Sequence, residues 1–237
     1  VPSSFRIARS LLSRLEDEKT GEILLEELNT EIPNYRIEET KNLVSILGNE
    51  VVEEFPWKNG MKPSTDDNVE GVLRRTWRPA LSIVGSDGMP STANAGNVLR
   101  PYTTLQLSMR IPPMVDPKKA VDAIEKVLED DIPYGASVEL EFEEAAEGWN
   151  APESKTWLLN AIEKASKEYF NQMPCTIGEG GTIPFMAMLG KQFPKAQFVI
   201  TGVLGPQSNA HGPNEFLHIP FAKNLTCCIS SIITDFQ

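Results

Sequence analysis

The sequence contains few of the residues from which redox and metal sites are most often built. Its 237 residues include only two histidines and three cysteines. Cys227 and Cys228 are adjacent in an apolar stretch, and Cys175 stands apart, so the spacing matches neither a zinc finger nor a disulfide framework. We therefore expect Cys227 and Cys228 to be reduced residues of the core.

Positive charge is also scarce. Lys and Arg number 22 against 33 Asp and Glu, which gives a net charge of −11 and a pI near 4.8. This balance argues against the basic surfaces that bind nucleic acid or anionic lipid. No apolar run approaches the roughly 18 residues of a membrane span, and no signal peptide is recognisable. We expect a cytoplasmic protein that binds neither nucleic acid nor membrane.

Residues 1–148 combine helical and strand patterns. Apolar spacing predicts helices over 3–15, up to about 55, over 68–77 and over 116–131. Alternation of apolar and polar residues predicts strands over 80–88, 98–113 and 136–145. In the second of these strands one face carries Thr103, Leu105, Leu107 and Met109. This order predicts an α+β domain over 1–148, an antiparallel sheet with helices on one face.

Residues 149–237 have a different pattern. A helix is predicted within 154–170, a glycine-rich loop follows, and a final helix is predicted over 221–236. Between them, residues 196–204 form a nearly continuous apolar run, which is typical of a strand buried on both faces. The order is that of an α/β domain, in which the loops after buried strands form ligand sites.

One of the two histidines follows that apolar run, in the polar loop "PQSNAHGPNEF" (206–216). Neutral imidazole is a common metal ligand, and Pro206 and Pro213 restrict the loop around His211. Metal binding by His211 is therefore one interpretation, and an ordinary loop histidine is the other. His218 lies between Leu217 and Ile219, and we expect it to be structural.

Two further groups are candidates for binding an anion. In "GEGGTIP" (178–184), Gly180 and Gly181 free backbone N–H groups, and Thr182 adds a hydroxyl where a helix begins. The alternative is a flexible helix entry, because the spacing matches no known phosphate or dinucleotide motif. Arg110 near the end of a strand has the geometry to clamp a carboxylate bidentately, or it is simply solvated.

Three stretches occur together in one order: "GNVLRPYTTLQLSMRIPP" (96–113), "GEGGTIPF" (178–185) and "GPQSNAHGPNEFLHIPFA" (205–222). In combination they resemble the M20 family of dinuclear zinc aminoacylases and carboxypeptidases. The family includes carnosinase-type dipeptidases, succinyl-diaminopimelate desuccinylase, acetylornithine deacetylase and glutamate carboxypeptidases, and the carnosinase-like branch is nearest. The resemblance implies an α+β lid over 1–148 that carries homodimerisation. It also implies that 149–237 is an incomplete α/β segment of the catalytic domain.

The resemblance also assigns roles to individual residues. His211 in "NAHGPNE" matches the late zinc ligand, and Arg110 in "SMRIPP" matches the lid arginine that clamps the substrate carboxylate. Asn97 matches a lid residue that reaches the active site of the partner subunit. Gly180, Gly181 and Thr182 match the substrate-binding glycine loop, although Gly178 replaces the family's arginine and Thr182 its serine.

Other parts of the family pattern are missing. The chain has no H-x-D segment, and its "EEAAEG" (143–148) lies at the wrong place in the order to hold the general base. No catalytic residue is therefore expected in this chain, which we interpret as the inactive C-terminal portion of a longer enzyme. In the complete enzyme two zincs per protomer are expected, with cobalt or manganese as alternatives, and the substrate is a dipeptide or an N-acyl amino acid.

Two other functions remain open from the sequence. The first is a non-catalytic dimerisation or interaction module of the same fold, with the acidic segment 16–54 facing a partner. The second is an unrelated α/β protein that binds phosphate with its glycine loop.

Overall fold

The computed structural model describes residues 1–180 and 184–236. The chain divides into two compact units. Unit 1 comprises Val1–Asn150 and Ile177–Ala187, and unit 2 comprises Ala151–Thr176 and Met188–Gln237. The glycine loop around Gly180 thus packs with the first 150 residues, although it follows them at a distance in sequence. The assignment of 1–148 to a lid and of 149–237 to a catalytic domain stays a prediction.

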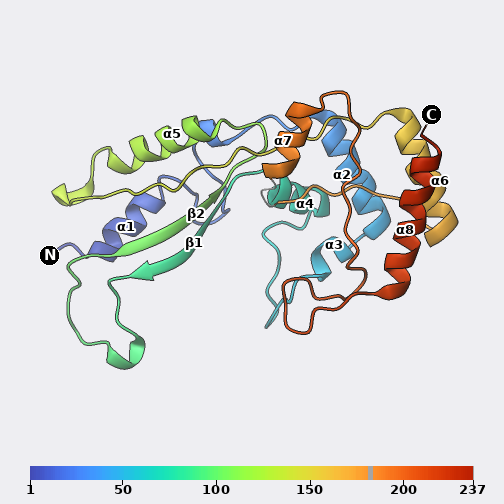
Figure 1. The fold of residues 1–237 in the computed structure, drawn as a ribbon. Coiled ribbons are helices and arrows are strands. Elements are labelled where there is room, and N and C mark those ends of the chain that lie inside the picture. Colours follow the sequence, from blue (N-terminus) through green and yellow to red (C-terminus); the bar gives the residue numbers. More distant parts are fainter. Residues whose placement is uncertain (181–183, 237) are drawn as a thin grey trace. The chain divides into compact units, whose positions relative to one another are not determined.

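Unit 1 contains a two-stranded antiparallel sheet (Figure 1). Strand β1 (Ala80–Asp87) pairs with β2 (Thr104–Arg110), so that Ala80 lies opposite Arg110 and Asp87 opposite Thr104. The register shifts between Ile83 and Gly85, which marks a β-bulge. Every second residue of β2 is half-buried, from Leu105 to Met109, and this confirms the predicted alternation.

The helices of unit 1 form where the sequence supplies caps and an apolar face. They are α1 (Ser4–Leu12), α2 (Asn34–Leu47), α3 (Glu50–Glu53), α4 (Asn68–Thr76) and α5 (Pro117–Glu129). In α5 the carboxylate of Asp116 accepts hydrogen bonds from the N–H groups of Lys118 and Lys119, and Pro117 occupies the first turn, as predicted. The second predicted helix is interrupted, because Gly48 adopts a left-handed conformation with φ 57° between α2 and α3.

The apolar faces of α1 and α5 pack on one side of the sheet (Figure 1). One buried cluster consists of Leu11, Leu15 and Leu128, and a second contains Ile23, Leu28, Val115 and Ala120. Leu81 of β1 packs against both clusters. A third cluster joins α2, α3 and α4 through Leu43, Val51 and Val72. The expected sheet with helices on one face is therefore present over the residues that form β1 and β2.

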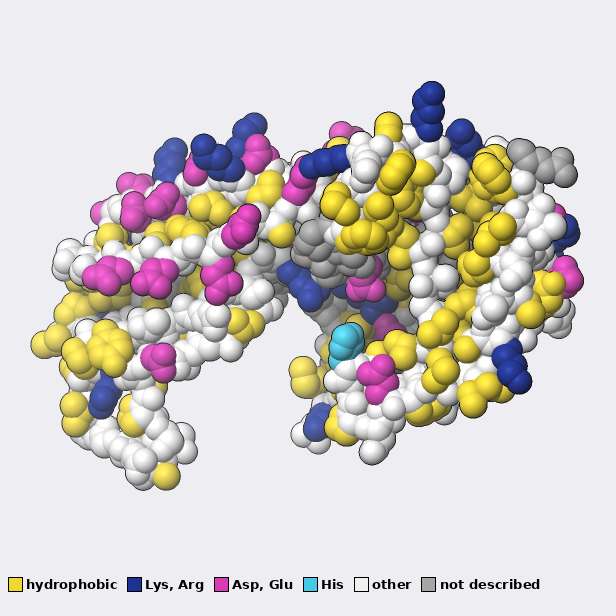
Figure 2. All heavy atoms as spheres, viewed as in Figure 1, with side chains coloured by type: hydrophobic (Ala, Val, Ile, Leu, Met, Phe, Trp, Pro, Cys, Tyr) yellow, Lys and Arg dark blue, Asp and Glu magenta, His cyan; other side chains and the backbone are white. Residues whose placement is uncertain are grey.

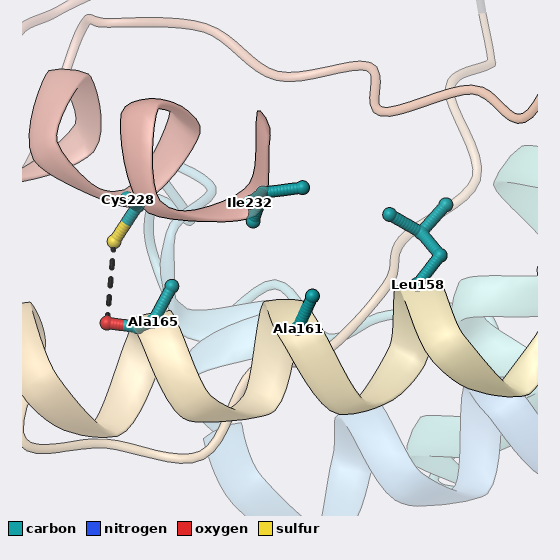
Figure 3. Close-up of a cluster of buried hydrophobic side chains, with 5 residues drawn as sticks. All are labelled: Leu158, Ala161, Ala165, Cys228 and Ile232. Atoms are coloured by element: carbon teal, nitrogen blue, oxygen red, sulfur yellow. Dashed lines mark hydrogen bonds between the residues drawn. The ribbon is translucent and has the colours of Figure 1, made fainter. Parts of the chain in front are cut away.

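Unit 2 is built on two helices, α6 (Thr156–Phe170) and α8 (Ile219–Thr234). They meet through Leu158, Ala161, Ala165, Cys228 and Ile232, all buried, and the thiol of Cys228 lies 3.4 Å from the carbonyl oxygen of Ala165 (Figure 3). Burial raises the pKa of the Cys228 thiol. Cys228 is thus a core residue as predicted. Cys175 is exposed. Cys227 is exposed too, contrary to the prediction, because adjacent helix positions such as 227 and 228 point about 100° apart.

Two predicted strands do not form. Residues 136–140 keep the alternating burial of a strand and 141–145 are exposed, but 136–145 pair with no other strand in the described parts of the chain. Residues 196–204 were expected to be buried on both faces, yet Val199, Ile200 and Val203 are each more than 40% exposed. An apolar pattern favours an extended chain, but a strand also needs a neighbour to accept and donate its hydrogen bonds. Neither segment is assigned as a strand in the described parts of the chain.

A further helix, α7 (Pro184–Gln192), follows the glycine loop. None of the described helices combines the length and the apolarity that a membrane crossing requires.

Candidate functional site

Three segments that are remote in sequence meet in unit 1 at the end of β2. A Cβ atom added to Gly180 would lie 2.4 Å from the carbonyl oxygen of Arg75 and 3.1 Å from Nη1 of Arg110. The first distance is shorter than any real contact of this kind, so only glycine fits between the end of α4 and the end of β2. The backbone of the glycine loop is thereby held beside a guanidinium group.

The end of α4 supports this arrangement through a second contact. A Cβ atom at Gly178 would lie 3.1 Å from Cβ of Thr76, and the Thr76 hydroxyl donates to the carbonyl oxygen of Val72 at 2.8 Å. Thr76 therefore keeps a fixed orientation under the loop. The carboxylate of Asp67 caps the start of the same helix by accepting from the N–H groups of Val69 and Glu70.

Arg110 is the one predicted site residue of unit 1 that lies at this junction with a side chain available to a ligand. It is exposed and forms no hydrogen bond or ion pair with any described residue. By contrast, Arg75 pairs with Glu54 at 2.5 Å and stacks over the ring of Phe55 at 5.3 Å. A guanidinium group without a protein partner beside close-packed backbone suits a ligand carboxylate.

Asn97 lies far from Arg110 within the chain. It is exposed in the connection between β1 and β2, next to the Asp87–Thr104 end of the hairpin. Arg110 lies at the opposite end of β2, and the seven residues of the strand separate the two ends by roughly 20 Å. Asn97 and Arg110 of the same chain therefore do not lie side by side. The other two predicted residues of the glycine loop, Gly181 and Thr182, lie outside the described residues.

The loop that carries His211 belongs to unit 2 and is built by local hydrogen bonds. The backbone N–H of His211 donates to the carboxylate of Glu215 at 2.9 Å, and the side-chain amide of Asn209 donates to the carbonyl oxygen of Pro213 at 2.7 Å. Ser208 is buried, and its hydroxyl donates to the carbonyl oxygens of Leu204 and Gly205. Short-range bonds of this kind hold the loop without help from distant segments.

The backbone of this loop is also unusual. Gln207, Asn209, His211 and Asn214 all have φ between 55° and 59°, a region that few residues other than glycine adopt. The side chain of His211 is exposed, and its imidazole forms no hydrogen bond or ion pair with any described residue. His218, in contrast, accepts a hydrogen bond at Nδ1 from the N–H of Phe221 at 3.1 Å and so caps α8, as expected of a structural histidine.

The described residues do not by themselves make a complete metal site. No three side chains of the His, Cys, Asp or Glu type come together within 1–180 and 184–236 to hold an ion. A catalytic zinc needs three protein ligands, and His211 offers one. The exposed imidazole of His211 can serve as one metal ligand. The described residues do not complete the set of three.

A cavity of about 460 Å³ lies elsewhere in unit 1, and the residues that line it include Ser64, Glu70, Arg74 and Arg78. Sequence reasoning did not single it out. Glu70 accepts two hydrogen bonds from Arg78, at 2.7 and 2.9 Å, and one from Arg74 at 3.2 Å. The hydrogen bonds from Arg78 lower the pKa of the Glu70 carboxyl group and raise the pKa of Arg78. These arginines are already paired, so the network fixes the position of α4 rather than offering a free charge.

Sequence reasoning also missed Arg75 and Thr76. They follow each other at the end of an ordinary amphipathic helix, and no motif marks them. The only signal in the sequence is indirect. A glycine permits the close approach of another backbone segment, but it does not identify that segment.

Comparison with known proteins places this geometry in context. No family model matches the sequence. A curated relative, the cysteinylglycine-S-conjugate dipeptidase of Corynebacterium striatum, is 29% identical over 156 residues, which cover 62% of this chain and 33% of that protein. Human carnosine dipeptidase 1 superposes with a TM-score of 0.70 at 18% identity, covering 99% of this chain and 49% of its own.

Two further solved structures agree. An M20 family metallo-carboxypeptidase from Sulfolobus solfataricus superposes with a TM-score of 0.74 at 19% identity, over 98% of this chain and 52% of that one. The chain has the fold of the M20 peptidases. The Saccharomyces cerevisiae dipeptidase Dug1p gives a TM-score of 0.73 at 19% identity, over 99% of this chain and 49% of its own.

The predicted resemblance to the M20 peptidases is therefore confirmed. The proteins that resemble this chain are named as peptidases, and peptidases are hydrolases. The chain spans a third of the curated relative and about half of each solved structure.

Proposed function

We propose that this chain is the lid and C-terminal catalytic segment of a metal-dependent M20-type hydrolase that cleaves a dipeptide. The observation that carries the proposal is the junction of the close-packed Gly180 with Arg110, which forms no hydrogen bond or ion pair with any described residue. The names of the curated relative and of two structural neighbours, all dipeptidases, support a dipeptide substrate over an N-acyl amino acid. A deacylase, such as a succinyl-diaminopimelate desuccinylase, has no such support.

The chain's own residues would act in binding and orientation. Arg110 would receive the carboxylate of the substrate, because a free guanidinium forms two parallel hydrogen bonds with it. The N–H groups of the glycine loop, with Gly180, Gly181 and Thr182, would hold a neighbouring substrate oxygen. Fixing the substrate at both points would present its amide bond in a single orientation to groups outside this chain.

The proposal includes a metal site to which His211 contributes one ligand. The stiff backbone of the loop and the free imidazole support this role. Zinc, two ions per protomer, is the proposed metal, with cobalt or manganese as alternatives. Since the described residues supply no complete ligand set, the other ligands and the general base would come from a part of the protein outside this chain.

We also propose that the complete protein is a homodimer through the lid, in which Asn97 acts in the site of the partner subunit. Its position at the far end of the hairpin from Arg110 supports a role outside its own site. The same connection exposes Val98, Leu99 and Tyr102, each more than half exposed. A non-catalytic dimerisation module is not favoured, because the relatives are peptidases.

The experiment that tests the proposed function measures dipeptide hydrolysis by the full-length protein with zinc, comparing Arg110→Ala with Arg9→Ala. Both changes remove one positive charge, but Arg9 is exposed on α1 away from the junction. Loss of a charge-assisted hydrogen bond predicts a kcat/KM about 10- to 100-fold lower for Arg110→Ala only. If Arg110→Ala hydrolysed the dipeptide as fast as Arg9→Ala, the carboxylate assignment would be wrong.

A further inference from the structure

Two aromatic side chains lie exposed just after α3 and form what we call the aromatic pair. Phe55 and Trp57 are 42% and 40% exposed, and their ring centroids are 6.0 Å apart in an edge-to-face arrangement. The indole N–H of Trp57 donates to the carbonyl oxygen of Val52 at 2.8 Å. The polar atom of this ring is therefore satisfied within the protein, so the surface that the pair offers to a ligand is ring carbon.

The aromatic pair is fixed in position relative to α4. The preceding helix, α3, packs on α4 through the buried side chains of Val51 and Val72. From α4 the guanidinium group of Arg75 lies over the ring of Phe55, 5.3 Å from its centroid. The two rings are thus held by contacts on the protein side while a large part of each remains accessible.

Arg75 also connects the aromatic pair to the candidate site. Its carbonyl oxygen is the backbone atom against which Gly180 packs, and Gly180 lies beside the guanidinium group of Arg110. The ring of Phe55 is therefore about the length of one arginine side chain from the backbone that supports the glycine loop. All of these residues belong to unit 1.

We propose that the aromatic pair binds the side chain of the substrate residue whose carboxylate Arg110 receives, and that this side chain is large and apolar. The inference rests on the proposed function and specifies its substrate class, a dipeptide with an aromatic or long aliphatic C-terminal residue. In such a residue the side chain branches from the carbon next to the carboxylate. A phenylalanine side chain is comparable in length to that of arginine, so it can extend from Arg110 toward the rings. Glycine at this place would leave the rings in water.

The charges beside the aromatic pair favour a neutral side chain. Arg75 already places a positive charge against Phe55, which disfavours a second cation on that ring. Its ion pair with Glu54 at 2.5 Å offsets the charge that would otherwise attract an acidic side chain. Figure 2 shows acidic side chains (magenta) gathered instead over α5 and the chain that follows it. Burial of apolar area against the rings is thus the interaction that this surface offers.

The test measures hydrolysis of the dipeptides Gly-Phe, Gly-Gly and Phe-Gly by the full-length protein with zinc. We expect kcat/KM for Gly-Phe to exceed that for Gly-Gly by about tenfold or more. Phe55→Ala and Trp57→Ala should each lower the value for Gly-Phe about tenfold and leave the value for Gly-Gly unchanged, because only Gly-Phe contacts the rings. Both variants should leave the value for Phe-Gly unchanged, since its large side chain lies on the other residue.

Two further variants separate substrate binding from folding. Phe5→Ala removes a ring of similar exposure, 46%, from α1, and it should leave the ratio of kcat/KM for Gly-Phe to that for Gly-Gly unaltered. Trp57→Phe removes the hydrogen bond to Val52 but keeps an aromatic ring, and it should retain most of this ratio.

The outcomes distinguish this inference from the proposed function. Equal kcat/KM of the unaltered protein for Gly-Phe and Gly-Gly would overturn this inference alone. Equal losses for all three dipeptides in the alanine variants, no loss in them, or a loss confined to Phe-Gly would do the same. If the unaltered protein hydrolysed none of the three dipeptides, the proposed function would fail together with this inference.

Discussion

The two candidate binding regions of this protein are held in place by different kinds of contact. The Arg110 junction in unit 1 depends on three segments, around residues 75, 110 and 180, that meet only after folding. The His211 loop in unit 2 is held by bonds that all lie within residues 204–218. A junction of remote segments is sensitive to a single added methyl group. The conformation of the local loop is held by several short-range hydrogen bonds, so that no one of them holds it alone. The difference predicts how each region responds to substitution.

The largest effect is expected from Gly180→Ala. The new methyl group would lie 2.4 Å from the Arg75 carbonyl oxygen, and backbone cannot move aside as a side chain can. Overpacking of this kind costs about 1–3 kcal/mol, so the stability of unit 1 should fall by that amount or the loop should separate from α4. Denaturant unfolding with hydrogen exchange at 68–76 distinguishes these outcomes. Gly202→Ala is the control, because nothing lies within 4 Å of that position.

Substitution of Ser208 should affect unit 2 to a smaller extent. The hydroxyl of this buried residue donates to two carbonyl oxygens at the start of the His211 loop. Ser208→Ala would leave the Gly205 carbonyl oxygen without this donor, whereas the Leu204 carbonyl oxygen keeps the N–H of His218 at 3.4 Å. The change should destabilise unit 2 by about 1–2 kcal/mol. Hydrogen exchange at 205–218 measures this directly. An unchanged exchange rate there would show that the loop does not depend on its local bonds.

A third prediction concerns Gly212. Its close neighbours are side-chain atoms, whereas the closest neighbour of Gly180 is a backbone oxygen. A Cβ atom there would lie 2.5 Å from the side-chain amide nitrogen of Asn209, a group that can rotate away. Gly212→Ala should therefore cost less than Gly180→Ala, about 1 kcal/mol, chiefly by weakening the bond from Asn209 to Pro213. The two variants are compared in the same denaturant series, and an equal or larger loss for Gly212→Ala contradicts the distinction.

The smallest effect is a pH dependence in unit 1. The hydrogen bonds from Arg78 lower the pKa of Glu70 in the folded state, so the unfolded state binds its proton more readily. The resulting stabilisation is present above the unfolded pKa of about 4.5 and is lost as the pH falls through the lower folded pKa. Glu70→Gln should therefore flatten the loss of stability as the pH falls below about 4.5. Glu26→Gln, at an exposed position, should leave the curve unchanged.

Particular residues show why some elements were predictable from the sequence and others were not. The Asp-Pro start and apolar face of α5 lie within one stretch, and its predicted bounds differ from Pro117–Glu129 by only one or two residues. Alternation likewise identified β2, whose partner β1 follows from a nearby hairpin. The same alternation predicted a strand at 136–145 that does not form, and the apolar run predicted one at 196–204 that does not form either. Strand pairing depends on a neighbouring strand, and the local pattern does not show whether that neighbour is present.

The candidate site divides in the same way. Motif resemblance selected Arg110, Gly180 and His211, but not Arg75 or Thr76, whose contribution is a position in space. Asn97, which the resemblance assigns to the site of the partner subunit, lies in the connection beyond the Thr104 end of β2, whereas Arg110 lies at the other end. His211 lies at the surface with a free imidazole, and its role as a metal ligand stays a prediction.

The sequence by itself determined the helices, the hairpin, the caps and the resemblance to the M20 peptidases, because these depend on residues a few positions apart or on short motifs. Only the tertiary structure decided that the glycine loop packs against α4 and β2, that Arg110 bonds to none of the described residues there, and that 136–145 and 196–204 do not form strands in the described parts of the chain. Such contacts join segments separated by dozens of residues. Their energies depend on distances that no local pattern encodes.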